Sequence, residues 1–176
     1  MKQIVSTWIL LAIVISCLLG IVHIVVQQDI RISANDPQIQ MAEDTASTLS
    51  SSAFLNLSQH KINIDQSLAP FIMTFDLNGA IRSSEAVLDG QTPVVPAGVF
   101  VYVQNNGEDR LTWQPKSGVR IAAVVTKYAN GYVLVGRNIR EVEKREDVLF
   151  AQIVFGWVVT LVVSFIGVFL FLPRKK

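Results

Sequence analysis

The stretch from Ile4 to Val26, IVSTWILLAIVISCLLGIVHIVV, contains no Asp, Glu, Lys or Arg. A second stretch of the same kind, VLFAQIVFGWVVTLVVSFIGVFLFL, runs from Val148 to Leu172. Each is longer than the roughly 20 apolar residues that a helix needs to cross about 30 Å of hydrocarbon. The sequence therefore predicts two membrane-spanning helices, and this expectation decides how the rest of the chain is organised.

Residues 27–147 lie between the two predicted spans and are numerous enough for one domain with a single core. The chain has 176 residues and a net charge of +1. From the amino terminus we expect a cytoplasmic tail at 1–3, a span at 4–26, the folded domain at 27–147, a second span at 148–172 and a basic tail at 173–176.

The distribution of charge predicts the orientation. The tails carry Lys2, Arg174, Lys175 and Lys176 and no acidic residue, whereas residues 27–147 hold 11 basic against 14 acidic side chains, a net charge of −3. Lys and Arg beside a span favour the cytoplasm. We therefore expect a multi-pass protein of the cytoplasmic (inner) cell membrane, with both termini in the cytoplasm, the central domain extracytoplasmic and the lipid bilayer as a partner.

Cys17 leaves an alternative open, because Val14-Ile15-Ser16-Cys17 loosely resembles a lipoprotein processing site. The apolar run continues for nine residues beyond Cys17, to Val26. A signal peptide has an apolar core of about 7 to 15 residues, so we expect an uncleaved anchor. Cys17 is the single cysteine, and the central domain therefore has neither a disulfide nor a thiolate.

Small residues recur every four positions in each span. They are Ala12, Ser16 and Gly20 in the first and Gly156, Thr160 and Ser164 in the second. Such spacing forms a groove that lets two helices approach closely. Packing of the two spans within one chain explains the pattern, and dimerisation between chains is the alternative. His23, near the outer end of the first span, is expected to reach the interface or a neighbouring helix rather than relay protons.

A helix is expected to start at Asp36, which is a good N-cap and is followed by Pro37. Residues 27–33 prolong the first span's helix before this interruption. Apolar residues then recur at helical spacing, and they are Ile39, Ala42, Ala46, Leu49 and Ala53. We expect this stripe to cover another element, with the helix ending near Phe54.

Five short segments rich in β-forming residues follow, at Phe71–Asp76, Ala80–Ser84, Arg110–Gln114, Val119–Tyr128 and Tyr132–Arg137. Asn78-Gly79 favours the positive φ values of a tight hairpin. Pro115–Gly118 and Ala129–Gly131 are also turn sequences. The sequence therefore predicts one five-stranded antiparallel sheet.

Two segments beside the strands are expected to be helical. Residues 96–107 give conflicting signals, because their valines favour a strand whereas Pro96 and Gly107 bracket them like a helix start and stop; we expect a helix. Asn138 and Glu141 are spaced like a capping box, and no Gly or Pro follows before Gly156. We expect a continuous helix from near Ile139, which couples the domain to the second span through Asn138, Glu141, Val142 and Arg145, with an i,i+4 pair between Glu141 and Arg145.

The predicted fold class is α+β: two transmembrane helices flank a domain with a five-stranded antiparallel sheet and helices packed on it. The hairpin Asp76-Leu77-Asn78-Gly79, the helical insert and the three-stranded meander occur in an order that resembles the extracytoplasmic PAS-like, or Cache, domains of bacterial receptors. The resemblance covers about residues 36–147. It implies a domain that lies between two spans and binds a small molecule against its sheet.

Trp113 and Arg120 are the candidate ligand-binding residues. On adjacent strands they would place an apolar ring beside a guanidinium suited to a carboxylate. The alternative is that Trp113 fills the core and Arg120 stacks on it or pairs with an acid. The central domain has one histidine, His60, without a ligand-spaced partner, and no hydrolase or nucleotide motif. We therefore expect no enzyme activity, metal, cofactor or nucleic-acid partner.

Receptors of the resembled class carry a kinase or methyl-accepting region after the second span, whereas this sequence has four residues after Leu172. The expected function is therefore a sensory or ligand-binding module that acts through a separate partner, either a membrane protein or a second copy. The alternative is a structural or accessory membrane protein whose outer domain docks on another envelope protein. A pocket beneath the helical layer would favour the sensor, and a filled core with an exposed apolar patch would favour docking.

Overall fold

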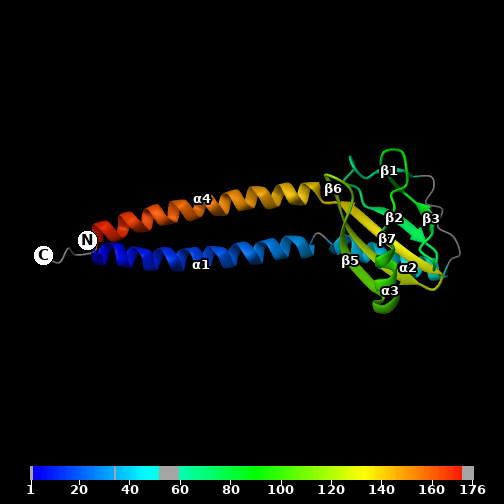
Figure 1. Cartoon of the computed structure of the whole chain (residues 1–176), viewed down its shortest axis with the longest axis horizontal. Coiled ribbons are helices and arrows are strands. Elements are labelled where there is room, and N and C mark those ends of the chain that lie inside the picture. Colours follow the sequence, from blue (N-terminus) through cyan, green and yellow to red (C-terminus); the bar gives the residue numbers. More distant parts are fainter. Residues whose placement is uncertain (1, 34, 52–59, 172–176) are drawn as a thin grey trace. The chain divides into compact units, whose positions relative to one another are not determined.

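The computed structural model describes residues 2–33, 35–51 and 60–171 (Figure 1). These residues belong to two compact units: a helical unit within residues 1–31 and 143–176, and an α+β unit at residues 32–142. Each unit is described by itself. The predicted helix end at Ala53 and Phe54 and the predicted tail at 173–176 lie outside the described residues.

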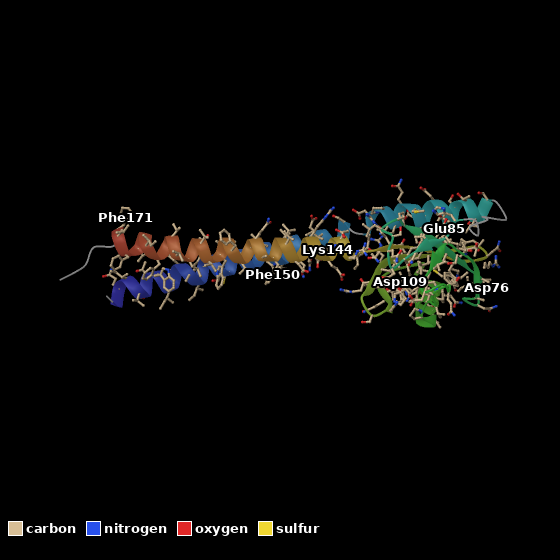
Figure 2. All side chains as sticks on the ribbon, turned by 90° about the horizontal axis from the view of Figure 1, so that it is seen from above. Asp76, Glu85, Asp109, Lys144, Phe150 and Phe171 are labelled. Carbon is tan, nitrogen blue, oxygen red and sulfur yellow. The ribbon has the colours of Figure 1, made fainter. Side chains whose placement is uncertain are left out.

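The helical unit consists of most of α1, Lys2–Ser33, and most of α4, Arg140–Phe171. Both helices are long and apolar enough to cross a membrane. They lie side by side in both views, and aromatic side chains from the two helices touch (Figures 1 and 2). As predicted, α1 continues through residues 27–33, and α4 is unbroken from Arg140.

The first helix that lies wholly within the α+β unit is α2, Asp36–Ser51. The carbonyl oxygen of Asn35 accepts hydrogen bonds from the N–H groups of Gln38 and Ile39, both at 3.0 Å, so the first turn starts one residue before the predicted N-cap. Helix boundaries of this kind vary by a residue or two. The predicted stripe is buried at Ala42, Ala46 and Leu49.

The predicted five-stranded antiparallel sheet is confirmed. Its strands are β2 (Phe71–Phe75), β3 (Ile81–Ser84), β5 (Glu108–Lys116), β6 (Val119–Tyr128) and β7 (Gly131–Asn138), in the order β3-β2-β7-β6-β5. The β2–β7 pairing joins the first hairpin to the last strand of the meander. A short parallel pair, β1 (Ile62–Asn63) with β4 (Ala86–Val87), was not predicted. Strands of two residues are too short to show a hydrophobic period.

The sheet is buried on both faces. On one face α2 covers Ile72, Val124, Val133 and Val135. The other face packs against α3 (Ala97–Asn106) and the β1–β4 pair. Figure 2 shows α2 and the segment containing α3 on opposite sides of the sheet. Strands buried on both faces need apolar side chains throughout, which explains why β2 and residues 131–136 of β7 are buried at every position.

The helix predicted at residues 96–107 is confirmed as α3. Gly107 ends it with a φ of 86°, and its N–H donates to the carbonyl oxygen of Val103 at 2.8 Å. A left-handed glycine that returns its N–H to the last turn is a common helix stop. The bracketing residues therefore outweighed the strand preference of the valines.

Two turns differ from the predictions. Asn78 does not adopt positive φ; Gly79 alone does, at 79°, and Asp76 Oδ1 accepts from the N–H groups of Asn78 and Ala80. This aspartate-capped turn is longer than the expected two-residue hairpin, and β3 starts at Ile81. Pro115 was expected at the first turn position but lies inside β5, at a bulge of this edge strand. A residue without an N–H fits there because no ladder bond is lost.

Candidate functional site

Trp113 and Arg120, the predicted ligand-binding pair, are not brought together. Trp113 is paired across the ladder with Ile121, and both side chains lie in the core beneath α3. Because side chains alternate along a strand, Arg120 projects from the opposite face of β6. There it is exposed. The single-residue offset between Arg120 and Ile121 is what separates the pair.

Side chains fill the space between α3 and the sheet. Phe100 of α3 lies between Phe75 and Tyr132, with ring centroids 4.8 and 5.3 Å away. Trp113 is 4% exposed and Val103 is fully buried. Gly79 belongs to the same contact, since a Cβ there would meet the Phe100 ring at 2.8 Å. Aromatic rings therefore occupy the position in which a small molecule was expected.

The outer face of α3 carries no charge, and it exposes Val101 and Tyr102 beside the polar residues Gln104, Asn105 and Asn106. Val101 is 60% exposed and Tyr102 52%, and Val94, just before the helix, is 80% exposed. We call these three residues the α3 patch. Leu77, on the hairpin tip that contacts Phe100 through Gly79, is also exposed. No Asp, Glu, Lys or Arg occurs in residues 97–106. A patch of large exposed apolar side chains often marks an interaction surface.

Asn138 joins three segments of the α+β unit. Its side chain is buried; Oδ1 accepts from the N–H of Arg140 at 2.9 Å, and Nδ2 donates to the carbonyl oxygen of Ile64 at 2.7 Å. The N–H of the next residue, Ile139, donates to the carbonyl oxygen of Arg120 at 3.1 Å. Asn138 therefore ties the end of β7 and the first turn of α4 to the loop after β1.

Two arginines hold the same loop. The Arg140 guanidinium lies 3.3 Å from the carbonyl oxygen of Asp65 and 3.4 Å from that of Gln66, and it donates to both. Arg137 Nε donates to the carbonyl oxygen of Leu68 at 3.0 Å. We call Asn138, Arg137 and Arg140, with the loop 64–68, the junction. The spacing of Asn138 and Glu141 indicated a cap, but the bonds to residues 64–68 had no signal in the sequence because they join residues about 70 positions apart.

The remaining predicted coupling residues follow in α4. Arg140 Nε lies 3.8 Å from Glu141 Oε1, and Val142 comes next, so both lie in the first turn. Arg145 is exposed. The helix has the predicted course, while its coupling role and the Glu141–Arg145 pair remain predictions.

One charged pair closes the loop before α3 onto β5. Lys116 Nζ lies 2.8 Å from Asp89, and both side chains are exposed. The hydrogen bond to Asp89 raises the pKa of Lys116. Exposed pairs of this kind contribute little to stability. Asp89 is also the non-glycine residue with positive φ among those described, at 50°.

In the helical unit, aromatic side chains make the contacts between α1 and α4. Trp157 Nε1 donates to Ser16 Oγ at 2.9 Å, and Trp8 Nε1 donates to the carbonyl oxygen of Leu161 at 3.3 Å. The Trp8 ring packs edge-on against Phe165 at 5.4 Å. His23 reaches the neighbouring helix, with its ring 5.2 Å from that of Phe150.

The predicted small-residue groove does not bring the helices close together at its glycines. A Cβ added at Gly20 or Gly156 would meet nothing within 4 Å. The hydroxyl groups of Thr160 and Ser164 bond to carbonyl oxygens of their own helix, as does that of Ser16 to Ala12. The large rings between the helices explain the difference, because they hold the two backbones apart.

Within residues 2–33, 35–51 and 60–171, no group of three His, Cys, Asp or Glu side chains could hold a metal ion. Comparisons with protein-family models, with curated proteins and with solved structures found no match. The candidate sites are therefore the α3 patch, the junction and the space between α1 and α4, each defined by its own geometry.

Proposed function

We propose that this chain is a two-span membrane protein whose extracytoplasmic domain acts by docking on another protein through the α3 patch. The observation that carries the proposal is the filled core beneath α3 combined with the exposed Val101 and Tyr102 on the uncharged outer face of the same helix. Phe75, Phe100 and Tyr132 occupy the space that a small ligand would need. Val94, Val101 and Tyr102 instead expose apolar side chains to the outside.

The chemistry of the patch also defines the partner. A short helix that presents aliphatic and tyrosine side chains fits an apolar groove, in which the tyrosine hydroxyl can still find a polar partner. Because α3 carries no charge, a complementary groove should be uncharged as well, since a buried unpaired charge would be costly. We therefore propose an apolar, concave protein surface as the partner.

The membrane topology and the PAS-like character are parts of the same proposal. Two helices of sufficient length and apolarity, with basic residues in the tails and a net negative charge between, support spans with both termini in the cytoplasm. The hairpin β2–β3, the insert α3 and the meander β5–β6–β7 follow the element order of the resembled domains. In this proposal the chain has a PAS-like fold and binds its partner through the surface of that fold.

A photo-crosslinking amino acid placed at Tyr102 tests the proposal in cells that naturally make the protein. We expect one discrete adduct on irradiation, which disappears when Val101→Asp puts a charge in the patch. The matched control is the same crosslinker at Lys127, an exposed position at the end of β6. Val101 is itself 60% exposed, so the aspartate should leave the fold intact, as circular dichroism of the variant can verify.

The mass of the adduct separates the outcomes. An adduct with a different protein supports docking as proposed, and an adduct of twice the chain mass would replace it with self-association. Equal, diffuse labelling from positions 102 and 127 would refute a specific site on α3.

A second candidate, a sensor that relays binding to α4, is favoured by the junction. Asn138 and Arg140 link the loop 64–68 to the first turn of α4, so a change in that loop would reach the helix. Asn138→Ala removes this link, so it should abolish a relay to α4 while leaving the Tyr102 adduct of the docking proposal unchanged.

A further inference from the structure

The face of α2 that packs on the sheet consists mostly of small and polar side chains. Its buried residues are Gln38, Ala42, Thr45, Ala46 and Leu49, and Ile39 and Met41 are partly buried beside them. The core on the opposite face of the sheet, beneath α3, contains the rings of Phe71, Phe75, Phe100, Trp113 and Tyr132. Because the free energy of burial grows with the apolar area removed from water, packing stabilises the α2 side less than the α3 side.

Hydrogen bonds do not attach α2 to the sheet. Between the described residues of α2 and the five strands there is no hydrogen bond. The hydroxyl groups of Thr45, Thr48 and Ser50 instead donate to carbonyl oxygens four residues earlier in the same helix, at 2.6, 2.8 and 2.8 Å. Separation of α2 from the sheet would therefore break no hydrogen bond between described residues.

Both sides of this interface bury polar atoms that lack a partner. Gln38, at the start of α2, is fully buried, and neither its Nε2 nor its Oε1 is hydrogen-bonded to another described residue. The same holds for Thr126 Oγ1 of β6. Thr126 pairs across the ladder with Val133, which packs beneath α2, and ladder partners share a face of the sheet. Water can satisfy these atoms only when α2 leaves the sheet, so they favour an open state.

The other connection of the α+β unit to a long helix is built differently. Asn138, Arg137 and Arg140 of the junction donate hydrogen bonds to carbonyl oxygens of the loop 64–68. In the chain, α2 is the element after α1, and α4 is the element after β7. The chain therefore enters the unit through a helix without hydrogen bonds to the sheet, and it leaves the unit through a hydrogen-bonded junction.

We propose that α2 is a releasable helix, which separates from the sheet as a unit while the sheet, α3 and the junction stay folded. Proteins commonly open in contiguous units at a lower free energy than global unfolding requires. The open state uncovers the apolar residues Ile72, Val124 and Val133. The α+β unit is thus connected firmly to α4 and reversibly to the segment that follows α1. Since α2 and α3 cover opposite faces of the sheet, this inference does not depend on docking through the α3 patch.

Native-state hydrogen exchange of the full chain in lipid nanodiscs tests the proposal. Ile121→Val weakens the core beneath α3, in which Ile121 is fully buried. Such a change should speed exchange through global unfolding about fivefold. We expect this acceleration in β6 and β7 but unchanged exchange at residues 40–49 of α2, because the open state keeps the core beneath α3 intact. Equal acceleration in α2 and in the strands would show that α2 opens only by global unfolding, and the proposal would be overturned.

Removal of an unpaired polar group from either side of the interface provides a second arm. Gln38→Met should slow the exchange of α2 about fivefold, and Thr126→Val should also slow it, because the closed state then buries one polar group fewer. Gln40→Met and Thr112→Val, at exposed positions, are the matched controls and should leave the exchange of α2 unchanged. Slowing by Gln38→Met alone would mean that the first turn frays without uncovering the sheet. That result would overturn release as a unit, as would the absence of any effect from both substitutions.

Discussion

Asn138 shows how much a single buried amide can organise. It satisfies the first turn of α4 with Oδ1 and the carbonyl oxygen of Ile64 with Nδ2. An asparagine can do both because one amide carries an acceptor and a donor. Neither alanine nor aspartate offers both functions, and the residue therefore holds two segments in a fixed register.

Asn138→Ala should destabilise the protein by about 1–3 kcal/mol, because the carbonyl oxygen of Ile64 loses its donor in a buried position. Hydrogen exchange of the full chain should also speed up at residues 62–68 before other parts of the sheet respond. Asn138→Asp is the informative comparison: it keeps the acceptor for the Arg140 N–H but lacks the donor. If exchange at residues 62–68 stayed unchanged in both variants, the junction would not hold this loop.

Gln38 is a residue whose burial the sequence did not suggest. It is fully buried in α2, and within the described part of the chain neither its Nε2 nor its Oε1 has a hydrogen-bond partner. A buried amide without partners costs about 1–3 kcal/mol. Gln38→Met keeps a similar shape without the polar atoms and should raise the free energy of unfolding by about 1 kcal/mol.

The thermal midpoint of Gln38→Met should rise by about 4 °C or more. Gln40→Met, at an exposed position of the same helix, should change the midpoint little, since surface substitutions usually stay within about 0.5 kcal/mol. A lower midpoint for Gln38→Met than for Gln40→Met would mean that the amide is paired in solution.

At the scale of elements, the sequence predicted most of the fold because its signals were local. Turn residues separated the strands, and Pro96 with Gly107 bracketed α3. The errors came where the outcome depended on distant partners. The β1–β4 pair joins two segments that are each too short to show a hydrophobic period. The bulge near Pro115 shifts the pairing of β5 with β6, so that Trp113 pairs with Ile121 and lies on the other face from Arg120. The α3 patch and the junction likewise needed the tertiary arrangement.

The start of α4 determines which proline substitution can break it. Val142 lies in the first turn, where a proline is tolerated because its N–H has no partner within the helix. Arg145 lies deeper, where proline removes a hydrogen bond and clashes with the preceding turn, at a cost of about 3 kcal/mol or more. We therefore expect Arg145→Pro to disrupt the helix near residues 141–146 and Val142→Pro to preserve it.

Spin labels at positions 143 and 150 of the full chain can measure this difference. In the unmodified protein and in Val142→Pro, the two labels should show one narrow distance distribution, as expected for a continuous helix. Arg145→Pro should broaden it, and Arg145→Ala should not, which separates the backbone effect from the loss of the side chain. A broad distribution in the unmodified protein would show that α4 is hinged, and a relay through it would be lost.

At the scale of the whole molecule, orientation in the membrane follows from charge. The basic tails and the net charge of −3 in residues 27–147 predict cytoplasmic termini and an outer domain. The prediction can be tested with single cysteines at Ser51, Gln104 and Lys176 in a Cys17→Ser background. Ser51 and Gln104 are exposed, on α2 and α3 respectively, so both should react with a membrane-impermeant maleimide on intact cells.

Lys176→Cys should react only after the cells are permeabilised. Two labelled positions in one domain distinguish membrane topology from local shielding. Cysteines at Ser51 and Gln104 should react with the maleimide to the same extent, unless a docked partner covers α3 and protects position 104 alone. Such selective protection, relieved by Val101→Asp, would support the α3 patch and the topology together. Labelling of Lys176→Cys on intact cells, with both domain positions silent, would reverse the orientation and move the docking surface to the cytoplasm.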